Sequence, residues 1–153
     1  MYTRLVVCSR IEERGTSLNR DSFAADCKLI QALANRSQAI PCGEGRVLFR
    51  QGEAPTGLYV LQSGEATLMR ETSSGRAIIC LQAGSGSLLG LPGIVANEPY
   101  TLTAVARKGS EVRFVTRSDF ENLLQMEPSL NSKVLQVLAA EIRSARQAFS
   151  DAH

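Results

Sequence analysis

The segment from Ser37 to Thr116 most constrains the fold, because its apolar residues recur with a period of two and glycine-containing turns separate the short apolar stretches. Successive side chains of a strand point to opposite faces, so this period predicts strands that bury one face. Short strands at close and regular intervals are typical of a β-sandwich or barrel. The expected strands cover residues 46–50, 57–61, 66–69, 77–81, 102–105 and 112–115.

Apolar residues at helical spacing precede this β segment. We expect Asp21 to be the N-cap of a short amphipathic helix, because an apolar pattern at three- and four-residue intervals begins directly after it. The residues of that pattern are Phe23, Cys27, Ile30 and Leu33 or Ala34.

Two further helices are expected after the last strand. Ser118 and Glu121 have the spacing of a capping box, which predicts a short helix over about residues 118–126. Pro128 then restarts the chain, and a long helix is expected over about residues 128–149. Its apolar stripe consists of Leu130, Val134, Leu138, Ile142, Ala145 and Phe149.

These elements predict the domain organisation and the fold class. A chain of 153 residues is long enough for one ordinary hydrophobic core. We expect an N-terminal arm over residues 1–20, where no period is sustained, and one domain over residues 21–153 with a β-roll at about 37–116. The predicted fold is mainly β with flanking helices: a double-stranded β-helix, or jelly-roll-like β-roll, followed by a long C-terminal dimerisation helix.

The longest interruption of the strand pattern runs over residues 82–99 and contains glycine at positions 84, 86, 90 and 93. A long irregular loop inside a compact barrel is uncommon and is usually functional. Pro92 is suited to the first turn of a helix, so a short helix is expected over residues 92–95.

Several kinds of chemistry are disfavoured. The single histidine is His153, so we expect neither histidine-based acid–base catalysis nor a histidine metal site of the cupin type. The cysteines are far apart with no CxxC pair, so we interpret them as free thiols; they are Cys8, Cys27, Cys42 and Cys80. The sequence therefore predicts no enzyme, no catalytic residue, no metal and no cofactor.

Charge and hydropathy also limit the partners. The 17 basic and 15 acidic residues are spread along the chain, which argues against a dedicated DNA-binding surface. The apolar run at residues 5–8 is too short for a signal peptide, and no later run has the length of a membrane span. We expect a cytoplasmic protein with no membrane partner.

The order of helix, β-roll with a glycine-bearing loop, short helix and long helix resembles the cyclic nucleotide-binding domain of the catabolite-activator and FNR-like regulators, the Crp/Fnr family. Residues 46–53 resemble that family's strand and Gly-Glu turn, and residues 59–65 resemble its next strand and turn. Residues 81–84 enter the loop, residues 89–91 stand where the family has Phe-Gly-Glu, and residues 99–104 replace its Pro-Arg-Ser/Thr-Ala stretch. The resemblance spans roughly residues 22–147.

The resemblance implies a ligand site. In the family, backbone N–H groups at a helix start receive the cyclic phosphate, an arginine neutralises it, and a glutamate accepts a ribose hydroxyl. Here the glutamate and arginine positions hold a leucine and a tyrosine, and losing one partner of a buried charge pair costs about 2–5 kcal/mol. We expect cyclic AMP and cyclic GMP to bind weakly or not at all, and a less charged effector to contact Leu89, Gly90, Leu91, Pro92, Tyr100 and Thr101.

A second interpretation stays open. Leu89, Leu91 and Ile94 could fill the barrel and leave no pocket, with Tyr100 as a surface aromatic that covers its mouth. The alternative function is a degenerate interaction and dimerisation module without a small-molecule ligand, and its main support is the loss of both charged residues, at Leu91 and Tyr100.

The long helix predicts a homodimer. A roll this small does not cover a helix of this length, and in the resembled family this helix pairs with its counterpart in a parallel dimer. The expected interface is Leu138, Ile142, Ala145 and Phe149. The family's regulators continue into a helix-turn-helix, whereas this sequence stops at His153, so we expect no direct DNA binding by this chain, as a stand-alone sensor or a fragment of a regulator.

Overall fold

The computed structural model describes residues 25–72, 74 and 76–152, and its account of side chains leaves out residues 77–80 and 144–152. The predicted N-terminal arm at 1–20 and the predicted cap at Asp21 lie outside the described residues. In the part that is described, no helix has both the length and the apolar character needed to cross a membrane.

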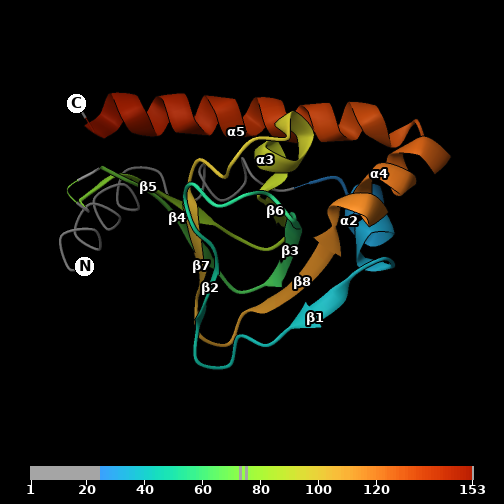
Figure 1. Cartoon of the computed structure of the whole chain (residues 1–153), viewed down its shortest axis with the longest axis horizontal. Helices are drawn as coiled ribbons and strands as arrows, with labels where there is room; N and C mark the ends of the chain where they lie inside the picture. Colours follow the sequence, from blue (N-terminus) through green and yellow to red (C-terminus); the bar gives the residue numbers. More distant parts are fainter. Residues whose placement is uncertain (1–24, 73, 75, 153) are drawn as a thin grey trace.

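Two four-stranded antiparallel sheets form the β-roll, and Figure 1 shows the long helix α5 lying across them. One sheet has the order β1 (Gln38–Ile40), β8 (Glu111–Thr116), β3 (Gly57–Ser63) and β6 (Ser87–Leu89). The other has the order β2 (Arg46–Phe49), β7 (Thr103–Ala106), β4 (Ala66–Glu71) and β5 (Ala77–Ala83). The predicted fold class, a β-roll with flanking helices and a long C-terminal helix, is confirmed.

The apolar core has two parts. The interior cluster lies between the sheets and includes Phe49, Leu61, Leu68, Leu81, Leu89 and Tyr100. The helix-side cluster lies between one sheet and the helices and includes Leu29, Leu58, Leu88, Leu91, Phe120 and Val134. Strand β3 contributes to both clusters, because Val60 and Leu61 point to opposite faces of the strand.

The helices begin at other residues than predicted. Helix α2 (Cys27–Ala34) begins after Asp26, whose side chain accepts a hydrogen bond from the Lys28 backbone N–H at 2.8 Å. Helix α4 (Arg117–Met126) begins after Thr116, whose hydroxyl accepts from the Asp119 backbone N–H at 3.1 Å. The predicted capping box at Ser118 is therefore wrong, because Thr116 is the N-cap and Ser118 already lies within the first turn of the helix. Helix α5 (Leu130–Ala152) follows Pro128 as expected.

The segment at 82–99 is more regular than predicted. It contains strand β6, which pairs with β3 so that Leu89 lies opposite Tyr59, and helix α3 (Leu91–Ala96). Gly90 stands between them with a φ of +85°, a left-handed conformation that glycine adopts readily. All three residues of β6 are buried, so the strand has no alternation by which the sequence could reveal it. The short helix expected at 92–95 is confirmed as α3.

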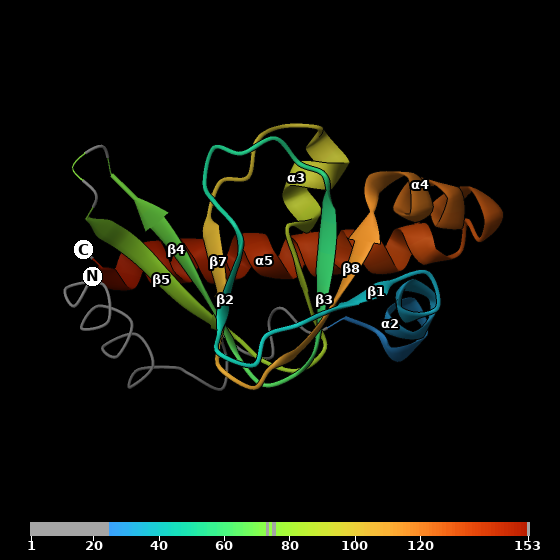
Figure 2. The same ribbon diagram turned by 60° about the horizontal axis from the view of Figure 1, so that its bottom comes forward.

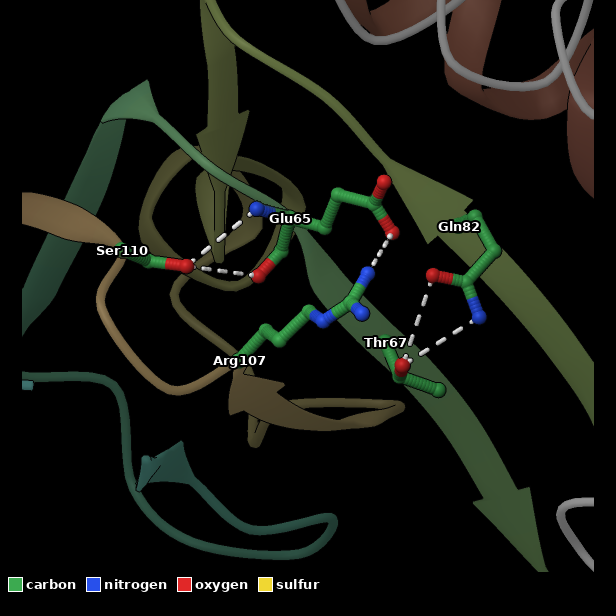
Figure 3. A network of polar contacts seen from close by, with 5 residues as sticks. All are labelled: Glu65, Thr67, Gln82, Arg107 and Ser110. Atoms are coloured by element: carbon green, nitrogen blue, oxygen red, sulfur yellow. Dashed lines mark hydrogen bonds and ion pairs between the residues drawn. The ribbon is translucent and has the colours of Figure 1, made fainter. Parts of the chain in front are cut away.

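A polar turn closes one end of the roll, and Figure 3 shows its side chains. A Cβ on Gly64, between β3 and β4, would lie 2.3 Å from the Ser110 Oγ. That hydroxyl accepts from the Glu65 N–H at 3.2 Å and donates to the Glu65 carbonyl at 3.1 Å, while Arg107 pairs with the Glu65 carboxylate at 3.3 Å. We call these four residues the Gly64 turn. Beside them, Thr67 and Gln82 are hydrogen-bonded between β4 and β5.

Candidate functional site

A small cavity lies at the other end of the roll, where β6 leads into α3. Five of the six predicted ligand residues line it: Leu89, Gly90, Pro92, Tyr100 and Thr101. Its volume is about 40 Å³. A site that holds one water needs a volume of roughly 10–15 Å³ on the same measure, whereas small-molecule pockets are typically about 300–1,000 Å³. The cavity in this conformation has room for water but not for a nucleotide.

The sixth predicted ligand residue, Leu91, lies elsewhere. Its side chain is fully buried in the helix-side cluster, together with Ile94. The first turn of α3 therefore directs the residue at the family's glutamate position towards the helices and not into the cavity. Of the three residues that could fill the barrel, only Leu89 belongs to the interior cluster.

Tyr100 is part of an aromatic stack inside the roll. Its ring centroid lies 4.1 Å from that of Phe49, and Phe49 in turn stacks on Tyr59 at 5.8 Å. Tyr100 is only 4% exposed, so the interpretation of this residue as a surface aromatic is wrong. The stack joins the end of β2, the middle of β3 and the chain before β7, which the sequence separates widely.

The hydroxyl of Tyr100 is fully used by the backbone at the start of β3. It donates to the Gly57 carbonyl at 2.7 Å and accepts from the N–H groups of Thr56 and Gly57 at 3.2 and 3.4 Å. A phenol has one proton to donate. In this conformation Tyr100 therefore offers a ligand no free hydroxyl proton.

The ring of Tyr100 covers the backbone that the resemblance assigns to phosphate binding. A Cβ on Gly90 would lie 3.0 Å from its Cε1 atom, and a Cβ on Gly93 would lie 3.1 Å from its Cδ1 atom. The missing side chains of these two glycines thus make room for the ring of Tyr100, and at Gly93 also for the Glu98 carbonyl oxygen, which would lie 3.1 Å from the Cβ. The space at the start of α3 is occupied by Tyr100.

Glu141 of α5 adds a carboxyl group to the lining of the cavity, and sequence reasoning missed it. Its side chain is partly buried, and the loss of solvation raises the pKa of this carboxyl to about 8. The signal was present in the spacing, because residues 134, 137 and 141 share one helical face and the two valines are buried. Of the described residues that line the cavity, none is an arginine or a lysine.

The predicted dimer residues divide into two groups. Leu138 is partly buried against the helix-side cluster, whereas Ile142 is 54% exposed. Leu135, which the prediction omitted, is 64% exposed and lies seven residues before Ile142. The side chains of Ala145 and Phe149 lie outside the described residues.

Within the described part of the chain, no group of three or more histidine, cysteine, aspartate or glutamate side chains could hold a metal ion. Cys27 is an exposed free thiol and Cys42 a buried one, and burial raises the pKa of the Cys42 thiol.

Comparison with known proteins gives the same family along most of the roll. Residues 41–127 match the family model described as cyclic nucleotide-binding domain. The chain is 27% identical over 124 residues to the CRP-like cAMP-activated global transcriptional regulator of Mycobacterium tuberculosis, which covers 80% of this chain and 54% of the regulator. It is 25% identical over 105 residues to lysophospholipase nte1 of Neurospora crassa, which covers 69% of this chain but 7% of that protein.

The fold is also found in solved structures. The catabolite activator protein of Thermus thermophilus has a TM-score of 0.66 and 24% identity, with 80% of this chain and 57% of that chain covered. The chain thus spans about half the length of the bacterial regulator and a small part of the lysophospholipase.

Proposed function

The chain belongs to the family of cyclic nucleotide-binding domains, and we propose that it is a non-catalytic regulatory sensor domain that responds to an effector other than a cyclic nucleotide. One observation carries this proposal: the ring of Tyr100 lies on Gly90 and Gly93, where the family receives the cyclic phosphate. The relatives include a transcriptional regulator, so we propose transcription regulation in the cytoplasm as the process, without direct DNA contact by this chain.

Both steric and electrostatic reasons support weak nucleotide binding. Tyr100 has to leave the aromatic stack and its three backbone partners before a phosphate can approach Gly90. Once Tyr100 has moved, no lining arginine meets the phosphate, and Glu141 presents a carboxyl group to the space. A carboxylate repels a phosphate, and a neutral carboxyl group does not neutralise it.

An effector that suits this lining is mostly apolar and uncharged. Leu68, Leu89 and Leu102 present aliphatic surface, and Glu141 with its raised pKa supplies a carboxyl that is mainly neutral at pH 7. A neutral carboxyl group donates one hydrogen bond and accepts others. The second candidate function, an interaction module without a small ligand, is favoured by the cavity volume of about 40 Å³.

Calorimetric titration with cyclic AMP and cyclic GMP tests the proposal directly. We expect no saturable heat at concentrations where a low-micromolar binder would saturate. A low-micromolar dissociation constant for either nucleotide would contradict the proposal, because it would require Tyr100 to leave its site at little cost.

Thermal unfolding with a panel of nucleotides and metabolites separates the two candidate functions. A ligand at 100 times its dissociation constant stabilises the folded state by about 2.7 kcal/mol, so a specific effector raises the melting temperature. A rise with an uncharged compound supports the sensor. No rise across a broad panel supports the interaction module.

We also propose that the domain signals as a homodimer through α5. Leu135 and Ile142 are exposed apolar residues seven positions apart, the spacing of a helix that pairs with a second helix. Ile142→Asp should halve the mass measured by light scattering, because it places a charge in the interface. Gln136→Asp, at an exposed polar position of the same helix, should leave the mass unchanged. Equal masses for wild type and Ile142→Asp would exclude this interface.

A further inference from the structure

A second, larger cavity lies between α3 and α4, away from Tyr100. In Figure 2, α3 and α4 lie on the same side of α5. The groove has a volume of about 350 Å³ and is lined from the α3 side by Val95 and from the α4 side by Arg117, Phe120, Glu121 and Leu124. We call it the α3–α4 groove. Its volume falls within the range of about 300–1,000 Å³ that is typical of small-molecule pockets.

Two nitrogen atoms of the Arg117 guanidinium have no hydrogen-bond partner. Its Nε and Nη2 atoms are shielded from solvent and make no hydrogen bond. A guanidinium is always charged in proteins, and a buried charged donor without a partner loses its hydration without compensation. Arg117 is also the first residue of α4, where the positive end of the helix dipole disfavours a cation. Both facts are explained if Arg117 binds an anion.

The other residues that line the groove indicate the chemistry of the rest of the ligand. Val95 is 50% exposed and Leu124 is partly buried, so an apolar group placed between them removes aliphatic surface from water. Glu121 is exposed at the same groove and places a negative charge near the anion. This charge opposes a phosphate dianion about twice as strongly as a monoanion.

We propose that the α3–α4 groove binds a small organic carboxylate with an apolar tail, held by Arg117. A planar guanidinium and a planar carboxylate form two parallel hydrogen bonds, which suits the unpaired N–H groups. The Nε and Nη2 atoms are shielded in this conformation, so binding requires the flexible side chain of Arg117 to rotate about its outer bonds and direct these donors into the groove. The inference concerns a different cavity from the Tyr100 site and does not depend on the proposed function.

Titration of the ¹⁵N-labelled chain with hexanoate, followed by NMR, tests the proposal. We expect saturable shifts of the Arg117 Nε–H signal and of backbone amides in α3 and α4. Acetate carries the charge without the tail, hexanol carries the tail without the charge, and hexyl phosphate carries a dianion. Each of these should bind more weakly than hexanoate.

Variants of Arg117 separate ligand binding from a structural role. Arg117→Met should weaken hexanoate binding at least about 10-fold, because a hydrogen bond to a charged group is lost. Arg117→Lys keeps the charge but not the planar fork, so it should show an intermediate loss even if the methionine variant folds poorly. Arg70→Met removes an exposed arginine on β4 and should change nothing. Equal hexanoate binding by wild type and Arg117→Lys, no saturable shift, or equal binding of hexanol would overturn the proposal.

Discussion

Strand β3 runs between two ends of the roll that are closed in different ways. At its Ser63 end, the Gly64 turn packs on backbone: a Cβ on Gly64 would lie 2.8 Å from the Ser110 Cα as well as 2.3 Å from its Oγ. At its Gly57 end, Gly90 packs on the ring of Tyr100, where the nearest atom would be 3.0 Å away. A backbone atom cannot retreat without refolding the turn, whereas a side chain can rotate.

The difference indicates which end can respond to a ligand. The Gly64 turn satisfies its polar groups with one another, so it serves the architecture of the roll. The Tyr100 end is closed by a side chain that fills a space at the start of α3, so it can open without loss of the sheets. The same residue type, glycine, permits close approach at both ends but with different consequences.

The largest expected effect is that of Tyr100→Ala. Removing a buried aromatic ring typically costs about 3–5 kcal/mol of unfolding free energy, because a cavity remains. Tyr100→Phe keeps the stack and leaves the Gly57 carbonyl without its donor, so it should cost only about 1–2 kcal/mol. Urea denaturation measures both. Equal losses for the two variants would show that the ring is not what closes this end.

Gly64→Ala should have the next largest effect. A left-handed φ of +94° costs a residue with a Cβ about 1–2 kcal/mol, and overpacking against Ser110 adds about 1–3 kcal/mol. Gly52→Ala is the matched control, since Gly52 has a φ of +91° but nothing within 4 Å of its Cβ position. The same denaturation experiment applies, and the close approach at Gly64 would be unimportant if the two alanine variants were equally stable.

The smallest effect should be that of Glu141→Gln, and it should depend on pH. Folding raises the pKa of this carboxyl from 4.5 to about 8. Below pH 4.5 the carboxyl is neutral in the folded and the unfolded chain, so Glu141 does not lower the free energy of unfolding. As the pH rises through 8 this stability is lost, because the unfolded chain ionises the carboxyl more easily than the folded one. Because the side chain keeps some solvent exposure, we expect the glutamine variant to be more stable than wild type by about 1–2 kcal/mol at pH 8 and equal to it near pH 4.

The control for this pH dependence is Glu121→Gln, which changes an exposed carboxylate. Its stability relative to wild type should not follow the same curve. A wild-type curve that is flat between pH 5 and pH 8 would show that Glu141 is well solvated, and the Tyr100 end would then lack the apolar surroundings described above.

Local patterns were sufficient to predict most of the roll. Alternating apolar residues or glycine turns mark five of the strands, which are β2, β3, β4, β7 and β8. Each of these sequence signals lies within a few residues along the chain. Strand β6 was missed because its side chains are buried on both faces. The cap of α4 was misplaced because Thr116 stands two residues before Ser118, which carried the sequence signal. Helix α2 is capped by Asp26, five residues after the expected cap at Asp21, and either aspartate fits the sequence pattern.

The candidate site was only partly predictable. The sequence shows that charge is missing at Leu91 and Tyr100, but it does not show that Leu91 turns to the helices and that Tyr100 joins Phe49. Those outcomes depend on strands that are distant in sequence. The lack of hydrogen-bond partners at the Arg117 Nε and Nη2 atoms is likewise a tertiary property, since it depends on which residues of α3 lie beside α4.

Because Tyr100 belongs to the same chain as the site it fills, its local concentration does not change when the protein is diluted. A ligand that needs the open site binds only the fraction of molecules from which the ring has departed, and its apparent dissociation constant is divided by that fraction. If closure is favoured by about 2.8 kcal/mol, the open fraction is about 1% and the ligand binds about 100-fold more weakly. The concentration at which the domain responds is then set by its own tyrosine as much as by the contacts of the ligand.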